Sequence, residues 1–371
     1  MNGGHEGAVA PRRMPQLTVG HRSVPVVLPG LGDPRFKVSA VIMTLQVLGQ
    51  TVLGFKVSIA QIAITIAVCA VVDLLVTLAR DRMLVWPASG ILTGSSIAFI
   101  LRATGTEHGD WWSLQGIQFF VLAGIVSLLS KYLIRLEGRH LFNPSNVGLV
   151  LTLLVVGPTG VFPQYLYWGP VGAPLAAAMA VILLGGFWVL SNVRMVAMAA
   201  SFFVTFALAI AACAASGRSY VAVWHPRPIT GAFYWLSILA SPEVLIFVFF
   251  MMSDPRTTPR SAAGRAFFGS LTGLMAAELI FFQTTEFGVK LAILSSLTLT
   301  CALVPVIDRL SFRVPLVRST GTSPAAPAAP VLRRVAAVAA AVALAVSVPA
   351  ASAALASDPR LIFVERGGAA Q

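Results

Sequence analysis

The segment Ser253–Pro259, SDPRTTP, brings a carboxylate, a cation and three hydroxyl groups together within seven residues. These groups could orient a polar heterocycle by hydrogen bonds, or they could form a solvated turn between two helices. Nine apolar residues precede the segment, and Pro255 and Pro259 prevent a helix from continuing through it. A binding loop and a plain interhelical turn are therefore equal alternatives at this stage.

A second polar segment, Gly138–Gly148, contains the triplet Asn143-Pro144-Ser145. Asn143 can cap a helix whose first turn begins with Pro144, and capping alone would explain the triplet. A capped helix N-terminus next to His140 would also suit a phosphate or another anion. Both interpretations stay open from the sequence.

Three acidic residues, Asp73, Glu243 and Glu278, lie inside long apolar runs. An ionised side chain in hydrocarbon costs about 2.5–3.5 kcal/mol, so we expect all three to face the interior of a helix bundle. Ion or proton coupling is one role for them, and pairing with a polar neighbour or protonation is the other. Glu243 follows the Ser241-Pro242 step, which favours function for this residue.

The composition identifies an integral membrane protein, because 57% of the 371 residues are hydrophobic and only 11% are charged. The formal net charge of +12 does not indicate nucleic-acid binding. The basic residues stand singly or in small groups between apolar runs, where they act as topology signals. The lipid bilayer is thus the first expected partner.

The chain contains three cysteines and five histidines, and neither set has the spacing of metal ligands. The cysteines lie in three different apolar runs, and the histidines lie in the N-terminal tail or in loops. We therefore expect no metal ion held by protein side chains.

Most apolar runs have about the 20 residues that span a bilayer, which predicts an all-α polytopic membrane protein with about ten transmembrane helices. The runs cover residues 38–55, 57–79, 84–101, 112–134, 143–158, 171–190, 195–216, 232–253, 266–283 and 287–306.

Loops alternating from an N-terminus inside the cell place 19 of the 26 lysines and arginines on the cytoplasmic side. This bias follows the positive-inside rule. It predicts a multi-pass protein of the bacterial inner membrane, with residues 1–37 as a cytoplasmic tail and 38–310 as the membrane domain.

Two of the runs look irregular, because Trp86–Phe99 is rich in small and polar residues and Ser241-Pro242 interrupts another. Broken helices at corresponding places in two halves are typical of inverted repeats around a site in the membrane. The segment Gly90–Gly94, GILTG, also recurs as GSLTG at Gly269–Gly273. We therefore expect two inverted-repeat halves with broken helices.

Residues 311–334 contain a Pro/Ala-rich linker, and residues 335–371 contain a basic pair, an Ala/Val-rich run and small residues. This order resembles an internal signal sequence. The run predicts an eleventh helix that anchors the C-terminus and leaves an external tail; a cleaved remnant is the alternative.

Five blocks in the same order resemble the family of the membrane D subunit of the Rnf electron-transport complex and the B subunit of the sodium-translocating NADH:quinone reductase (RnfD/NqrB). The resemblance runs from about residue 38 to residue 313. The blocks are ASGILTGSSIAF (Ala88–Phe99), HLFNPSNVGLVL (His140–Leu151), FFMMSDPRTTP (Phe249–Pro259), AGRAFFGSLTGL (Ala263–Leu274) and LVPVIDR (Leu303–Arg309).

The resemblance implies about ten helices in two inverted halves, a bound flavin, and other membrane redox subunits as partners. Family members attach FMN to the threonine of a Ser/Thr-x-Ala-Thr motif, which this sequence lacks. The nearest segments, Leu101–Thr104 and Thr230–Phe233, each lack one required residue. We therefore do not expect covalently bound FMN. We expect FMN or riboflavin that is held without a covalent bond.

Our leading hypothesis is a redox subunit that holds this flavin between the halves and has no catalytic residue of its own. The polar lining that it predicts consists of Ser89, Thr93, Asn143, Ser145, Asp254 and Thr257. A transporter or exporter on the same scaffold, coupled through Glu243 and Asp254, is the alternative, and a scaffold for partner subunits is a third. The residues of these blocks look most similar to those of the UnbU-type membrane proteins associated with enediyne biosynthesis. This resemblance suggests a role in the biosynthesis of a natural product.

Overall fold

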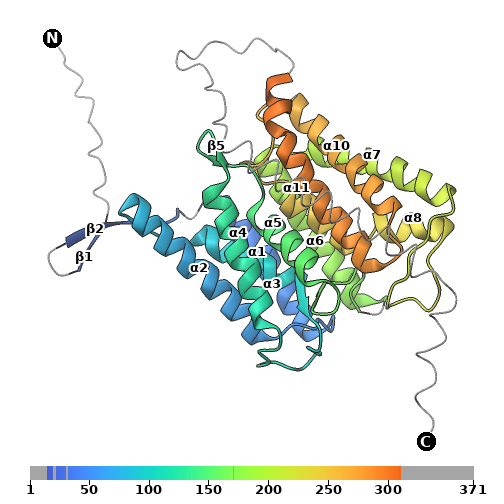
Figure 1. The fold of residues 1–371 in the computed structure, drawn as a ribbon, viewed down its shortest axis with the longest axis horizontal. Helices are drawn as coiled ribbons and strands as arrows, with labels where there is room; N and C mark the ends of the chain where they lie inside the picture. Colours follow the sequence, from blue (N-terminus) through green and yellow to red (C-terminus); the bar gives the residue numbers. More distant parts are fainter. Residues whose placement is uncertain (1–14, 20–21, 31, 170, 311–371) are drawn as a thin grey trace, which may run out of the picture.

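The computed structural model describes residues 15–19, 22–30, 32–169 and 171–310, and it is built mainly of α-helices (Figure 1). The first half contains α1 (Pro34–Thr51), α2 (Ile59–Asp81), α3 (Ala88–Ile100), α4 (Ile117–Leu133) and α5 (Pro144–Val156). The second half contains α6 (Ala173–Val193), α7 (Val196–Ala215), α8 (Gly231–Leu239), α9 (Pro242–Ile246), the π-helix η1 (Phe247–Met251), α10 (Ala262–Phe281) and α11 (Glu286–Leu310).

Each of the ten apolar runs contains one of these helices or helix groups, which confirms the mainly helical membrane architecture. Five helical segments are long and apolar enough to cross a membrane by length and composition. They are Ile59–Asp81, Ala173–Val193, Val196–Ala215, Gly231–Met251 and Glu286–Leu310. The count of ten spans and the inverted repeat therefore stay predictions.

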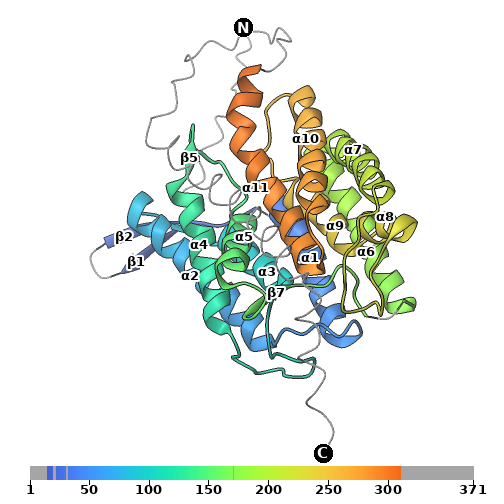
Figure 2. The same cartoon turned by 45° about the vertical axis from the view of Figure 1, so that its right-hand side comes forward.

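Outward-facing apolar side chains agree with a lipid-facing surface. Leu75, Leu184 and Leu208 are each more than half exposed although they lie in the middle of long apolar helices. Large contiguous apolar surface of this kind is rare on a soluble monomer. In two views, α2 and α4 lie at one end of the bundle and α7 and α10 at the other (Figures 1 and 2).

The small residues of α3 permit close helix packing, and the helix itself is regular from Ala88 to Ile100. A Cβ atom on Gly90 would lie 2.5 Å from the carbonyl oxygen of Cys69, and one on Gly94 would lie 2.7 Å from the Cα atom of Ile66. Only glycine lets α3 approach the backbone of α2 so closely. Within Ala88–Ile100 the helix has no break, because its small residues form a packing face. The run 84–101 is interrupted at its ends instead, where short strands at Leu84–Val85 and Leu101–Ala103 flank the helix.

The segment Gly269–Gly273 has the same Gly-x-x-x-Gly spacing as Gly90–Gly94 and the same packing role, here between α10 and α7. A Cβ atom on Gly269 would lie 2.2 Å from the carbonyl oxygen of Met198, and one on Gly273 would lie 2.9 Å from that of Phe202. The recurrence of GILTG as GSLTG is therefore explained by two similar helix contacts.

The predicted break at Ser241-Pro242 is confirmed. Helix α8 ends at Leu239, and α9 begins at Pro242 after Ser241 caps it by accepting a hydrogen bond from the Val244 amide at 3.2 Å. The helix then widens into η1, and π-turns of this kind occur frequently at functional sites.

Helices α3 and α5 have 13 residues each, or about 20 Å, which is shorter than a bilayer core. Each helix leads towards a short strand on the same face of the bundle. The strands β4 (Leu101–Ala103) and β7 (Val161–Pro163) pair with each other antiparallel. Their pairing satisfies backbone groups that lipid could not satisfy.

The predicted N-terminal tail contains regular structure, because β1 (Gln16–Val19) and β2 (Arg22–Val27) form a hairpin that pairs with β3 (Leu84–Val85). Helix α1 already begins at Pro34, within the range assigned to the tail. The predicted linker 311–334 and the C-terminal anchor 335–371 lie outside the described residues.

Candidate functional site

A cavity of 690 Å³ lies where the beginnings of α1, α3 and α5 meet the end of α6, η1 and the loop after η1. Small-molecule sites in proteins have volumes of about 300–1,000 Å³. We call it the Asp254 cavity. The side chains that matter below are Asp33, Arg35, Ser89, Thr93, Ser96, Phe99, His140, Asn143, Ser145, Phe250, Asp254 and Arg256.

Five of the six residues predicted to line a flavin site are in this wall, although they come from three distant parts of the chain. These five are Ser89, Thr93, Asn143, Ser145 and Asp254. The sixth, Thr257, is buried inside the loop and does not line the cavity; its hydroxyl donates to the backbone oxygen of Asp254 at 3.2 Å. Thr257 therefore stabilises the turn that presents Asp254.

Helix α3 contributes a stripe of hydroxyl groups along the cavity. Ser89, Thr93 and Ser96 follow each other at spacings of four and three residues, which places them on one face of the helix. Phe99 continues the same face at the inner end of the cavity. The α3 side of the cavity is therefore polar at Ser89 and Thr93 and aromatic at Phe99.

Asn143 has a structural role, because both the oxygen and the NH₂ group of its side chain form hydrogen bonds within the protein. Its side-chain oxygen accepts from the Ser145 hydroxyl at 2.9 Å and from the Asn146 amide at 3.2 Å, which caps α5. Its NH₂ group donates to the carbonyl oxygen of Met251 at 3.0 Å. Asn143 therefore ties the start of α5 to the end of η1.

Asp254 is held by two partners. Its Oδ1 accepts from the Arg256 amide at 2.9 Å, and its Oδ2 lies 3.1 Å from Nε2 of His140. The hairpin of β5 (Arg135–Leu136) and β6 (Arg139–His140) places this imidazole against the loop. The pairing joins residues 114 positions apart, so sequence spacing alone could not reveal it.

The surroundings of Asp254 lower the pKa of its carboxyl group. Burial acts to raise this pKa, but the hydrogen bond and charge of His140, together with the amide and charge of Arg256, outweigh it. The group therefore stays ionised in a loop that lines a cavity.

Replacing Asp254 by asparagine is expected to destabilise the protein at pH 7 by about 1.5 kcal/mol, the low end of the range for hydrogen bonds to a charged group. Because the folded-state pKa is lower than the ordinary 3.8, the stabilisation is complete above pH 3.8 and is lost as pH falls through the folded value. The difference between the thermal unfolding midpoints of the two proteins, measured from pH 7 to pH 3, should therefore shrink as pH falls below 3.8. A constant difference would show that the charge of Asp254 is not its cause.

Two cations stand at the mouth of the cavity. Arg35 and Arg256 both line it, and Asp33 caps α1 and binds Arg35 through hydrogen bonds at 2.9 and 3.0 Å. The Asp33 carboxylate consequently has a lowered pKa, chiefly because of its hydrogen bond to Arg35. Arg35 was not among the predicted site residues, because an arginine at the start of a helix has no distinctive sequence signal.

The buried Asp73 lies next to the same cavity and is paired. It accepts hydrogen bonds from the Lys131 ammonium group, from the Tyr132 hydroxyl at 2.5 Å and from the Gly90 amide at 3.1 Å. Lys131 also donates to the Ser89 hydroxyl at 3.0 Å. An ion pair thus supports the polar end of the α3 stripe.

Glu243 is also buried and paired. Its Oε2 contacts the ammonium group of Lys290 in α11, and its Oε1 accepts from the Trp168 indole at 2.9 Å. Both charged side chains are 3% exposed. The expectation that Glu243 faces the interior is confirmed, and its partner is a lysine inside the predicted run 287–306 that was not among the predicted site residues.

The same expectation for Glu278 is wrong, because its side chain is exposed. Glu278 lies on the outward face of α10, one turn before the helix ends at Phe281. A carboxylate so close to a helix end can reach the polar boundary of a membrane without crossing hydrocarbon. Glu278 is therefore a poor candidate for coupling.

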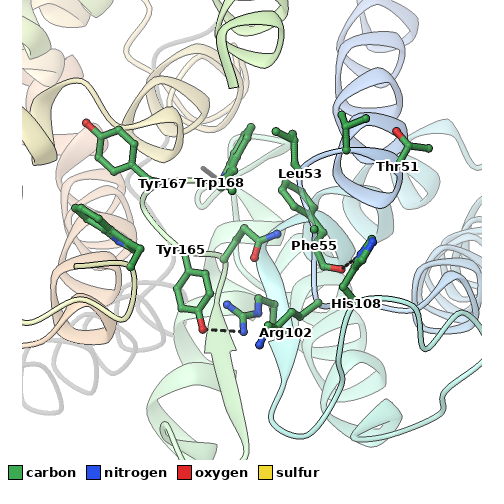
Figure 3. A pocket seen from close by; sticks show the side chains of 14 residues that line it. Thr51, Leu53, Phe55, Arg102, His108, Tyr165, Tyr167 and Trp168 are labelled. Atoms are coloured by element: carbon green, nitrogen blue, oxygen red, sulfur yellow. Dashed lines mark hydrogen bonds between the residues drawn. The ribbon is translucent and has the colours of Figure 1, made fainter. Parts of the chain in front are cut away.

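A second cavity, of 500 Å³, lies at the other end of α1 and α3 (Figure 3). We call it the Arg102 cavity. Helix α1 starts at the Asp254 cavity with Arg35 and ends at the Arg102 cavity with Thr51. The two cavities thus open towards opposite faces of the bundle.

Three aromatic rings connect the walls of the two cavities. Phe99 lines the Asp254 cavity, and its ring centroid lies 5.7 Å from that of Phe55 and 5.6 Å from that of Trp168, which both line the Arg102 cavity. Phe55 and Trp168 are 5.2 Å apart. One layer of edge-to-face rings therefore lies between the inner ends of the cavities.

Residues 161–315 match the model of the NQR2, RnfD, RnfE family. The matched segment runs from β7 through the described end of α11, and it includes η1, Asp254, Glu243 and Lys290. No curated protein matches the chain at a significant level. The match supports the resemblance to RnfD/NqrB over this part of the chain, and the long apolar helices indicate a multi-pass membrane protein.

Proposed function

We propose that this chain is a membrane subunit of an electron-transport assembly and that it holds FMN or riboflavin in the Asp254 cavity without a covalent bond. The observation that carries the proposal is the convergence of Ser89, Thr93, Ser145 and Asp254 on one cavity of suitable volume. The family match over residues 161–315, which include Asp254, supports a membrane subunit of this kind.

The donor set of the cavity fits a flavin. The ring system of a flavin has one polar edge with nitrogen and oxygen atoms and one apolar edge, and this cavity offers hydroxyl groups on α3 together with apolar side chains such as Phe99 and Phe250. Ser89 and Thr93 would hold the polar edge by hydrogen bonds. Arg35 and Arg256 would bind the phosphate of FMN at the mouth.

A bound flavin supplies the one- and two-electron chemistry, while the protein contributes position, electrostatics and exclusion of water. Asp254 and His140 hold the loop that closes one side of the cavity. We further propose an inner-membrane location with a cytoplasmic N-terminus, partner redox subunits, and a role related to the UnbU-type proteins of enediyne biosynthesis. The Asp73–Lys131 pair would couple ion or proton movement to the cavity through Ser89.

The absorption spectrum of detergent-purified protein tests this proposal. We expect a flavin spectrum in the folded protein, and we expect acid denaturation to release the flavin into the supernatant because no covalent bond holds it. A preparation that contains no flavin in either fraction contradicts the proposal. Flavin that stays with the precipitated protein contradicts the non-covalent assignment.

A transporter or exporter without a redox cofactor is the second candidate. The two cavities on opposite faces, separated by the rings of Phe55, Phe99 and Trp168, favour it, because alternating access needs a barrier between two such openings. Flavin-free protein that carries a proton or substrate flux in proteoliposomes would support this function. The absence of flux from flavin-containing protein would exclude it.

A further inference from the structure

The Arg102 cavity contains side chains that the proposed function does not use. Arg102 lies in β4 opposite Phe162 of β7. Just after β7, the backbone N–H of Gln164 donates to the carbonyl oxygen of Ile100 at 2.6 Å. Because side chains alternate along a strand, Arg102 and Gln164 lie on the same face of this ladder. Both residues line the cavity.

The Arg102 guanidinium is buried and largely unpaired. Its side chain is 8% exposed and makes one hydrogen bond, from Nη2 to the Tyr165 hydroxyl at 3.3 Å, shown as a dashed line in Figure 3. Among the described residues, its Nε and Nη1 atoms have no partner. Buried N–H groups of a charged side chain are unfavourable without acceptors, so this arrangement indicates a missing acceptor.

Gln164 repeats the same pattern. It is 3% exposed, and within the described part of the chain its side-chain NH₂ group has no acceptor. The cavity therefore presents N–H donors from two residues, and these donors lack acceptors. Buried polar groups in native proteins are nearly always paired, which makes two such residues in one cavity significant.

No nearby carboxylate forms an ion pair with Arg102 among the described residues. Glu107 pairs with Lys56 at 2.7 Å, and Oε1 of Glu286 accepts from the Leu166 amide at 2.6 Å and from the Trp224 indole at 2.8 Å. Oε2 of Glu286 has no hydrogen-bond partner in the described structure, and the charge of Arg102 acts on this carboxyl group from a distance. The unpaired N–H groups of Arg102 are therefore left for a ligand.

The rest of the wall is aromatic. The Arg102 guanidinium carbon lies 4.0 Å from the centre of the Tyr165 ring, and Phe55, Trp168 and Trp224 form other parts of the lining. A guanidinium fork matches the paired oxygens of a carboxylate or a phosphate, and aromatic rings pack against an apolar or flat body.

We propose that the Arg102 cavity binds an anionic group, a carboxylate or a phosphate, carried on an aromatic or apolar body. Arg102 and Gln164 donate to the anion, and the rings enclose the body. The ligand comes from one of two sources, a soluble organic anion or the headgroup of an anionic lipid. The site is separate from the Asp254 cavity, so it stands even if the flavin proposal fails.

The test uses the full-length protein in a neutral detergent, with phenyl phosphate and inorganic phosphate as soluble probes at constant ionic strength. We expect both probes to raise the unfolding midpoint, with phenyl phosphate effective at lower concentration because its ring packs on the aromatic wall. Nanodiscs of phosphatidylcholine with and without phosphatidylglycerol test the lipid source. Stabilisation by the soluble probes assigns a soluble anion, and stabilisation by phosphatidylglycerol alone assigns a headgroup.

Two variants and one control make the assignment specific. Arg102→Met is expected to weaken binding about tenfold to a hundredfold, with each ligand-induced shift measured against the variant's own midpoint without ligand. Gln164→Met should weaken binding by a smaller factor. Arg218→Gln changes an exposed arginine that stacks on Phe281 outside the cavity, and it should leave binding unchanged.

The proposal is overturned if neither soluble probe nor phosphatidylglycerol stabilises the wild-type protein. It is also overturned if the stabilisation survives in both Arg102→Met and Gln164→Met. Flavin content measured in the same samples separates this result from the proposal for the Asp254 cavity.

Discussion

Replacing Lys290 by methionine is expected to destabilise the protein by about 3–5 kcal/mol, because it leaves the Glu243 carboxylate buried without its cation. Both side chains are 3% exposed, so water cannot take the place of the lost partner. The unfolding midpoint in detergent, or the concentration of denaturing detergent at half-unfolding, measures the effect.

The double variant Lys290→Met/Glu243→Gln separates a lost charge from lost packing. Glutamine keeps an oxygen that can accept from the Trp168 indole, so the double variant should regain most of the stability lost in the single one. Glu278→Gln, which changes an exposed carboxylate, should shift stability by less than about 0.5 kcal/mol. A single Lys290→Met variant as stable as the wild type would contradict the buried pair.

Gly269→Ala is expected to lower stability by about 2–3 kcal/mol, the upper part of the range for overpacking. The added Cβ atom would lie 2.2 Å from the carbonyl oxygen of Met198, and a backbone atom cannot move aside as a side chain can. Helices α10 and α7 would have to separate. The better helix propensity of alanine, about 1 kcal/mol, offsets only part of this cost.

Gly185→Ala is the matched control in α6. The three atoms nearest to its Cβ atom would all belong to the Val41 side chain, the closest at 2.6 Å, so a side chain and not the backbone would have to shift. We expect a change smaller than that of Gly269→Ala when both are measured by the same unfolding assay. Equal effects would show that the α7–α10 contact is looser than described.

The positions of the helices followed from the sequence because long apolar runs have one stable form in a membrane. The bend at Ser241 was also predictable, since Pro242 cannot continue the preceding helix. The unbroken course of α3 could not be predicted. A helix break and a tight contact between two helices are both rich in glycine and serine, so composition does not distinguish them. Gly90 shows the difference only when the backbone of α2 is next to it.

The site was predictable in its polar residues and not in its pairings. Ser89, Thr93 and Asp254 came from the family resemblance, and they line one cavity. The pairs that support or accompany it, such as Asp73–Lys131 and Glu243–Lys290, join residues far apart in the chain. No local pattern encodes such contacts, so the sequence could not predict these pairs. For the same reason it could not show which face of α10 carries Glu278.

The flavin content of Thr93→Leu, compared with wild-type protein and with Thr44→Val, tests the central claim most directly. Thr93 lines the Asp254 cavity, whereas Thr44 is exposed on α1 outside it and donates only to the carbonyl oxygen of Ala40 at 2.8 Å. We predict that acid releases flavin from wild-type protein and from Thr44→Val, and that Thr93→Leu retains only a small fraction of it. Wild-type protein without flavin, or a Thr93→Leu variant that retains the wild-type amount, would contradict the account.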